Sequence, residues 1–155
     1  LSHLRNIIPG ADHWPRFVKN LSEQFEARLS LVEVTKSPSL FLKGMAGSIL
    51  PIATSHGEGR VEYYHNDDHN QLNQNNQVII RYVDNYGQPT NQYPSNPNGS
   101  IDGVAGFCSE DGRVTVIMPH PERVIRSVQH SWCSSDWDDN GPWLKIFHNA
   151  REWID

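Results

Sequence analysis

The sequence is organised around residues 114–123, which read Val114-Thr115-Val116-Ile117-Met118-Pro119-His120-Pro121-Glu122-Arg123. The β-branched apolar run at the start of this stretch is typical of a buried strand, and Pro119 ends it. His120 is therefore expected at the carboxyl end of a strand, where open α/β sheets bind ligands. Glu122 follows two residues later, and a carboxylate beside an imidazole can fix its tautomer and stabilise its charged form. The stretch predicts the orienting half of a nucleophilic triad, without its nucleophile.

Length and composition indicate one ordinary globular domain. The chain has 155 residues, of which 37% are hydrophobic and 20% charged, enough for one real core. Its net charge is −5 and its basic residues are scattered, so nucleic acid is an unexpected partner. The sequence contains neither an apolar run of about 20 residues nor a secretory signal, so we expect no membrane partner and a cytoplasmic location.

Cysteine and histidine positions offer few further sites. Cys108 and Cys133 match neither a disulfide framework nor a zinc motif, and reduced structural thiols are expected. His65 and His69 could face one way on a helix as metal ligands, but without a third ligand at a sensible spacing a solvated surface is the simpler interpretation. Because glycine-rich dinucleotide and Walker-type phosphate motifs are also missing from the sequence, this chain should not bind ATP or a dinucleotide through them.

Hydrophobic periodicity predicts a mixed α/β domain. Strands are expected over 26–34, 40–42, 49–53, 78–83, 104–108 and 113–118. Apolar residues at helical spacing predict a helix from Leu1 to Ile8, stopped by Pro9-Gly10, and another from Pro142 to Ile154 whose aromatic face should pack on the sheet. Residues 65–77 are polar and predict an exposed helix or loop. A chain that begins inside a helix is expected to be the carboxyl-terminal piece of a larger protein.

Residues 118–123 resemble the His-Pro-Glu signature of triad (class I) glutamine amidotransferases. Further segments extend the likeness over nearly the whole chain: Phe25-Glu26-Ala27-Arg28, Pro51-Ile52-Ala53, His56-Gly57-Glu58-Gly59-Arg60, Arg81-Tyr82-Val83-Asp84-Asn85 and Asn96-Pro97-Asn98-Gly99-Ser100. Together they resemble the carboxyl-terminal glutaminase domain of phosphoribosylformylglycinamidine synthase in its large, single-chain bacterial form.

This resemblance implies a fold and a missing part. The expected fold is α/β, a flavodoxin-like class I glutamine amidotransferase sheet with flanking helices and its amino-terminal part missing. Residues 1–155 would then form a partial glutaminase domain. The nucleophilic cysteine of the family lies on an elbow that would fall just before Leu1, and neither cysteine of this chain matches it. The fragment alone is therefore expected to be inactive.

The resemblance also implies site residues and partners. His120 would move the proton from the cysteine thiol to the leaving ammonia, and Glu122 would orient it. Asn20, Phe25 and Glu26 are the expected contacts to glutamine. His56, Glu58, Asn96 and Asn98 could line the rim or a domain interface, or could equally be structural. Ammonia would pass to a synthase domain of the same polypeptide, where ATP and magnesium bind, so this chain itself is expected to hold no cofactor or metal.

Two alternatives remain open from the sequence. The chain could be a non-catalytic interaction or regulatory domain that keeps the scaffold but has lost the nucleophile. It could also be a metal hydrolase built from its eight histidines, which requires at least three of them to meet around one ion.

Overall fold

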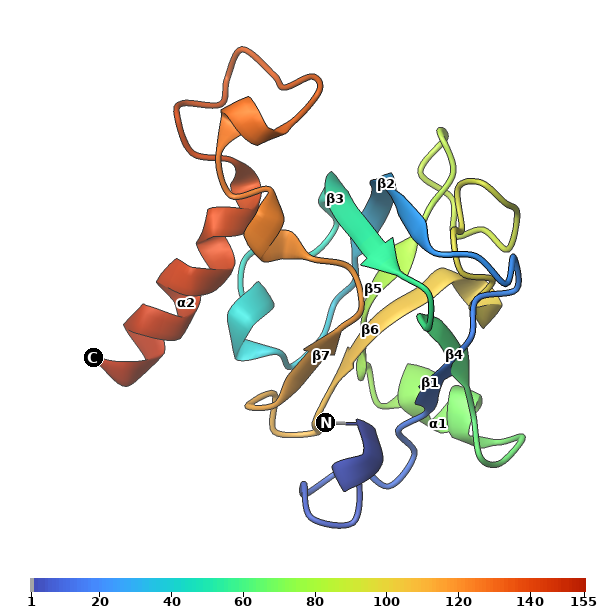
Figure 1. Ribbon diagram of the computed structural model, residues 1–155. Helices are drawn as coiled ribbons and strands as arrows, with labels where there is room; N and C mark the ends of the chain where they lie inside the picture. Colours follow the sequence, from blue (N-terminus) through green and yellow to red (C-terminus); the bar gives the residue numbers. More distant parts are fainter. Residues whose placement is uncertain (1) are drawn as a thin grey trace.

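A five-stranded sheet forms the centre of the computed structural model, which describes residues 2–155 (Figure 1). Its strand order is β3-β2-β5-β6-β7, with bounds Ile49–His56, Glu26–Val34, Val78–Tyr82, Val104–Cys108 and Thr115–Ile117. Every neighbouring pair runs antiparallel. A separate two-stranded ladder joins β1 (Arg16–Val18) to β4 (Arg60–Glu62).

Helices are short and lie on both sides of the sheet. Figure 1 shows α2 (Lys145–Ile154) on one side and α1 (Asp68–Gln74) beside the small ladder on the other. Single 3₁₀ turns make the remaining helical segments: Ser2–Leu4, Leu40–Leu42, Ile101–Gly103, Pro121–Arg123, Ser127–Gln129 and Pro142–Leu144. Within residues 2–155, none of the helices has the length and apolar character needed to cross a bilayer.

The chain that leaves β7 returns to the opposite edge of the sheet. His120 forms an isolated antiparallel bridge with Ala53 of β3, and its N–H donates to the Ala53 carbonyl at 2.7 Å. Since β3 and β7 are the two outer strands, this bridge joins the two edges of the curled sheet. The contact between Ala53 and His120 is here called the seam, and His120 is held there.

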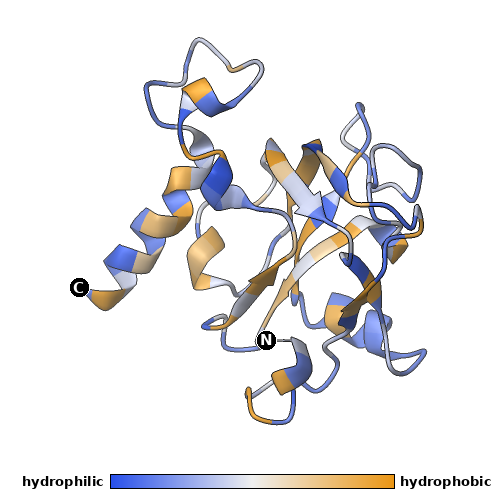
Figure 2. Ribbon diagram, in the orientation of Figure 1, coloured by the Kyte–Doolittle hydropathy of each residue, from blue (hydrophilic) through white to orange (hydrophobic). Residues whose placement is uncertain are grey.

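One face of the sheet, here called the α2 face, packs against α2 and the 3₁₀ turn 40–42. Antiparallel partners project to the same face, so alternate residues of each strand enter this core. Its buried members include Val32, Val34, Ile52, Ile80, Tyr82, Leu42, Met45, Trp143 and Ile146. Figure 2 shows the hydrophobic colouring on β7 and on the turn beside it, and alternating colours along α2. Trp143 Nε1 also donates to the Pro51 carbonyl at 2.7 Å, which ties the start of α2 to β3.

A second core covers the other face of β6 and β7, here called the α1 face. Trp14 meets Phe107 edge-on with centroids 5.1 Å apart, and Phe17 stacks on the same ring at 5.5 Å. Leu72 of α1 and Val61 of β4 complete the cluster. The small ladder and α1 thus bury the face that α2 does not reach.

Most of the expected strands are confirmed. Residues 26–34, 78–82 and 104–108 are strands as the periodicity predicts. Every neighbouring pair in the sheet is antiparallel, as is usual for strands joined without helical crossovers. The prediction of a buried strand around residues 114–118 is wrong, because residues 115–117 are half-buried.

Three local predictions differ from the structure. Residues 40–42 form a 3₁₀ turn, not a strand. The helix expected over residues 1–8 reduces to a 3₁₀ turn at Ser2–Leu4 followed by turns, with Ile7 76% exposed; Leu1 lies outside the described residues. So short a segment is unstable as a helix unless its apolar side is buried. In the last helix Trp143 is buried, whereas Phe147 and Trp153 are 46% and 59% exposed, so only part of its aromatic face packs.

Candidate functional site

His120 and Glu122 form the central pair of the site. His120 Nδ1 lies 2.7 Å from Glu122 Oε1. Pro121 begins the 3₁₀ turn 121–123, and this turn folds the glutamate back onto the ring. Because Nδ1 faces a carboxylate, it carries the hydrogen, and Nε2 remains free to take or deliver a proton. The arrangement suits general acid–base chemistry.

A cavity of about 290 Å³ opens beside this pair. Its walls come from the 3₁₀ turn 40–42, from β7 and from α2, and its lining residues are Phe41, Thr115, Ile117, Pro119, His120, Pro121, Glu122 and Ile146. The side chains that surround the His120 imidazole and the Glu122 carboxylate in this cavity are therefore mostly apolar. The His120 side chain is 30% exposed, so a ligand in the cavity can reach it.

The backbone of His120 is fixed on both sides. Its N–H donates to Ala53 in β3 at 2.7 Å, and its carbonyl accepts from the Arg123 N–H at 3.3 Å. The Arg123 Nε also lies 3.8 Å from Glu122 Oε1. These contacts hold the ring position before any ligand arrives, which is what a catalytic base requires.

Asn20, one of the expected glutamine contacts, is buried and internally bonded. Its Nδ2 donates to the carbonyls of Gln24 at 2.9 Å and His56 at 2.8 Å, and its Oδ1 accepts from the Gly59 N–H at 3.0 Å. Both amide hydrogens are thus used to join two loops. The structure gives Asn20 a structural role, and a direct contact to glutamine remains a prediction.

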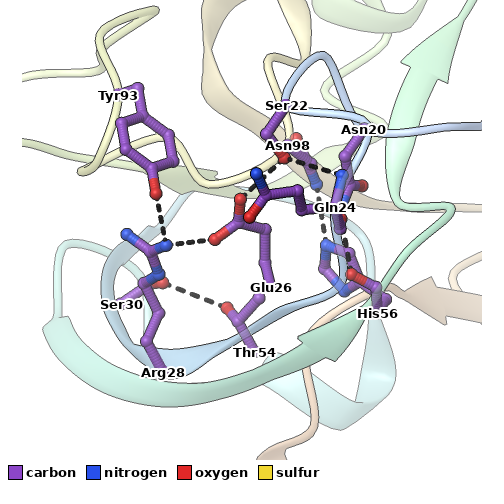
Figure 3. A network of polar contacts seen from close by, with 10 residues as sticks. All are labelled: Asn20, Ser22, Gln24, Glu26, Arg28, Ser30, Thr54, His56, Tyr93 and Asn98. Atoms are coloured by element: carbon purple, nitrogen blue, oxygen red, sulfur yellow. Dashed lines mark hydrogen bonds and ion pairs between the residues drawn. The ribbon is translucent and has the colours of Figure 1, made fainter.

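Glu26 is also committed to internal contacts. It is 3% exposed, accepts from Ser22 Oγ at 2.7 Å and forms an ion pair with Arg28 (Figure 3). Arg28 in turn donates to Tyr93 Oη at 2.8 Å, and this hydrogen bond is the largest cause of the raised pKa of its guanidinium. Phe25, by contrast, is 66% exposed and needs no rearrangement to touch a ligand.

Strand register places Glu26 and the Ala53–His120 bridge on different faces of β2 and β3. Glu26 pairs with His56, while Ala53 lies three residues earlier on the same strand. Residues an odd number apart in a strand project to opposite faces. The Glu26 side chain therefore projects from the face of the sheet opposite the Ala53–His120 bridge, although the resemblance predicts that Glu26 and His120 both lie beside glutamine.

The expected rim residues form a buried network. His56, Asn96 and Asn98 are 7%, 1% and 0% exposed, and Glu58 is exposed. Asn96 Nδ2 donates to the carbonyls of Thr90 and Ser100, at 2.9 and 2.8 Å, and so braces its own loop. Sequence reasoning missed the roles of Arg28 and Tyr93, although Arg28 stands two residues after Glu26 and so on the same strand face.

Neither cysteine takes the position of a nucleophile. Cys108 is fully buried, and burial raises the pKa of its thiol to about 12. A thiol with that pKa is protonated at neutral pH and unreactive. Cys133 lies half-exposed in the loop after the His-Pro-Glu turn.

We predict that an aromatic disulfide reagent at pH 7.5 labels one thiol of the folded chain and two after unfolding. Cys133→Ser should abolish the fast labelling and Cys108→Ser should leave it unchanged, since burial protects Cys108. Fast labelling of Cys108 in the folded chain would contradict its assigned burial. The measurement is the absorbance of the released thiolate with and without denaturant.

The two histidines considered as metal ligands do not share a helix. His65 lies before α1, which begins at Asp68, whereas His69 lies in α1 with its Nε2 3.1 Å from Asp102 Oδ2. Across residues 2–155 the structure contains no group of three or more His, Cys, Asp or Glu side chains able to hold an ion. The geometry gives the metal hydrolase alternative no support.

Comparisons with known proteins identify the family and the fold class of the chain. A family model described as a CobB/CobQ-like glutamine amidotransferase domain matches residues 1–154. Among solved structures, the chain is similar to PurLQS from Thermotoga maritima, with a TM-score of 0.64 and 22% sequence identity over 91% of this chain and 53% of that one. The chain thus spans about half the length of that structure, and the likeness confirms the α/β fold class. This chain belongs to the family of CobB/CobQ-like glutamine amidotransferase domains.

Proposed function

We propose that this chain provides the acid–base half of the glutaminase site of a phosphoribosylformylglycinamidine synthase. The observation that carries the proposal is the 2.7 Å contact between His120 Nδ1 and Glu122 Oε1 at the edge of an apolar cavity. Membership of the amidotransferase family and the fold shared with PurLQS support it. The ammonia released would serve the ATP-dependent amidation of formylglycinamide ribonucleotide in purine biosynthesis.

His120 exchanges protons in both halves of the proposed reaction. A cysteine thiol gives its proton to His120 Nε2, and the thiolate attacks the γ-amide carbon of glutamine. The tetrahedral intermediate collapses to a thioester as His120 returns the proton to the leaving nitrogen, which departs as ammonia. Water, deprotonated by His120, then releases glutamate and restores the thiol. Glu122 stabilises the imidazolium that forms each time.

The nucleophile in this scheme comes from outside the 155 residues. Cys108 is buried and protonated at neutral pH, and Cys133 lies in the loop that follows the His-Pro-Glu turn. We therefore assign the thiol, and the backbone donors that stabilise the tetrahedral oxyanion, to another segment of the polypeptide. The fragment by itself should bind or turn over glutamine poorly.

The proposal also fixes where the other reactants bind. The partner is a synthase domain of the same polypeptide, which takes the ammonia and binds ATP and magnesium. Residues 2–155 contain no group of three or more His, Cys, Asp or Glu side chains able to hold a metal ion. We further propose a cytoplasmic location, in line with a role in purine biosynthesis, and the net charge of −5 supports the expectation that the chain does not bind nucleic acid.

The direct test compares this chain with the full-length polypeptide that contains it. Glutamate release from glutamine is measured for both, with and without ATP and the ribonucleotide. The full-length protein should release glutamate, and the 155-residue chain should show only background. A full-length protein that lacks glutaminase activity but still binds its synthase domain would favour the alternative of an interaction or regulatory domain.

A further inference from the structure

A second cleft, here called the lysine cleft, is formed by the chain that connects β2 to β3. Its volume is about 400 Å³, and its lining includes Thr35, Lys36, Ser37, Ser39 and Lys43. These five residues provide two ammonium groups and three hydroxyl groups, and the lining contains no carboxylate. A cleft lined by charges of one sign concentrates counter-ions of the other sign. The lysine cleft therefore favours an anion.

Neighbouring side chains do not neutralise the lysines of this cleft. Lys36 and Lys43 are exposed, and within residues 2–155 neither of them forms an ion pair. A third lysine reaches the rim from α2, since a Cβ built on Gly44 would lie 3.4 Å from Lys145 Cε and 3.9 Å from its Nζ. Three ammonium groups thus border one loop of a chain whose net charge is −5.

The loop that forms the cleft is held in place by two other parts of the fold. The Leu40 N–H donates to the carbonyl of Gly112, in the turn between β6 and β7, at 3.1 Å. From the other side, Asn149 Nδ2 of α2 donates to the carbonyls of Phe41 and Lys43, at 2.8 and 2.9 Å. A ligand would therefore bind without paying the full entropy of ordering the loop.

The same loop forms a wall of the cavity beside His120. In the 3₁₀ turn 40–42, the first and last residues line the lysine cleft, whereas Phe41 lines the cavity. Ser39 of the cleft and Thr115 of the cavity share a hydrogen bond of 2.9 Å between their hydroxyl oxygens. Figure 1 shows this turn between α2 and β7. A ligand that shifts or stiffens the turn would therefore act on both cavities.

We propose that the lysine cleft binds a phosphate group, free or carried by a small metabolite, and that the bound phosphate acts on the cavity beside His120 through the shared turn. Phosphate fits the lining, because the ammonium groups of Lys36 and Lys43 and the hydroxyl of Ser37 can all donate to its oxygens. A volume of about 400 Å³ also lies in the range of small-molecule sites. The effect on catalysis rests on the proposed glutaminase function, whereas the binding does not.

Nitrogen-15 NMR of the 155-residue protein tests the binding. Inorganic phosphate, ribose 5-phosphate and AMP are added separately at constant ionic strength. The amide signals of residues 35–46 should shift and saturate, with a dissociation constant of about 1–10 mM for inorganic phosphate, as expected for ammonium groups screened by water. The order of the three affinities identifies free phosphate, a sugar phosphate or a nucleotide as the preferred source of the group. Shifts that do not saturate, or that acetate reproduces equally, would overturn the proposal.

Lysine variants show whether the cleft is the site. Lys36→Gln and Lys43→Gln should each weaken phosphate binding by about threefold, the effect of losing one exposed ion pair. Charge reversal of both, in Lys36→Glu with Lys43→Glu, should abolish saturable binding. Lys19→Gln is the matched control, because Lys19 is an exposed lysine outside the lining of the cleft, and it should bind phosphate as the wild type does. Unchanged binding in the charge-reversed protein would refute the site.

The link to the cavity beside His120 has its own measurement. The amide signals of Thr115 and Ile117, which line that cavity, should shift with the same dissociation constant as those of the cleft. Ser39→Ala removes the hydroxyl contact to Thr115 and should reduce these shifts while phosphate still binds. Cavity signals that stay unchanged when the cleft is saturated would refute the link.

The full-length polypeptide shows whether the link affects catalysis. Over the phosphate concentrations that saturate the cleft, kcat/KM for glutamine should change by about twofold or more, and this change should disappear in the charge-reversed protein. An unchanged kcat/KM in an active enzyme would refute the regulatory part of the proposal. A wild type without glutaminase activity would refute the proposed function and leave the NMR results for the cleft intact.

Discussion

Replacing His120 by alanine in the full-length polypeptide is expected to lower kcat/KM for glutamine hydrolysis by about 10³-fold or more, as for loss of the base of a nucleophilic triad. In the proposed mechanism the ring is the base that activates the thiol and the acid that protonates the departing ammonia, so both steps would lose their proton carrier. Its side chain is 30% exposed and its anchoring contacts run through the backbone, so the fold should survive. Initial rates of glutamate release, with thermal unfolding as a check, measure the effect.

Two further variants show whether the loss is specific. Glu122→Gln keeps the shape of the side chain but removes the charge at Oε1, and should cost about 10- to 100-fold, as for residues that orient a reacting group. His148→Gln removes an exposed histidine of α2 and should leave kcat/KM unchanged. Full activity in His120→Ala would eliminate the acid–base assignment, and a loss as large in His148→Gln would indicate a general effect on the fold.

The strands that sequence analysis located correctly are of two kinds: residues 26–34 have one buried face, whereas 78–82 and 104–108 are apolar runs buried on both faces. Burial alternates at the end of strand 26–34, because Val32 and Val34 enter the core while Glu33 between them does not. A period of two of this kind can be recognised from the sequence alone. The β6–β7 hairpin was readable for a similar reason: Gly112 provides the positive φ, +72°, that its turn needs. Local patterns therefore located one central strand of the sheet and the hairpin that leads into the His-Pro-Glu turn.

The polar network was beyond sequence analysis because its partners are distant in the chain. Asn20, His56 and Asn98 are polar residues of loops and strand ends, which composition assigns to solvent. They become buried because each satisfies the others across separations of 36 to 42 residues. The order of the five strands is likewise not readable from any single strand, because it depends on pairing between distant segments.

The contact of His120 with Glu122 was the part of the site that sequence could predict. Glu122 follows His120 by two residues, and His120 has a proline on each side that restricts the backbone. Both features are local in the sequence. What sequence could not supply was the seam at Ala53, which decides where the ring lies relative to the sheet. The His120–Glu122 contact is thus the local part of the site, whereas the internal contacts of Asn20, which join it to His56 and Gly59, connect residues distant in sequence. The roles of all the named residues toward glutamine remain predictions.

Trp143→Ala is expected to destabilise the chain by about 3–5 kcal/mol, the usual cost of truncating a large buried aromatic residue. Trp143 is completely buried in the core of the α2 face, and its Nε1 donates to Pro51 at 2.7 Å. Urea unfolding followed by far-ultraviolet circular dichroism gives the free energy. Trp143→Phe keeps most of the packing but loses the hydrogen bond, and should cost less than the alanine substitution.

Trp153 provides the matched control for this result, because it is a tryptophan of the following helix, α2, with 59% of its surface exposed. Trp153→Ala should change the free energy of unfolding by about 1 kcal/mol at most, as most exposed substitutions do. The Trp143 substitution should also reduce glutaminase activity in the full-length protein, because Pro51 lies two residues before Ala53, the acceptor of the His120 N–H. Equal effects of the two tryptophan substitutions on stability would contradict the burial of Trp143 and the contribution of its contact with Pro51, and with them the support that this contact gives to β3, the strand that holds the backbone of His120.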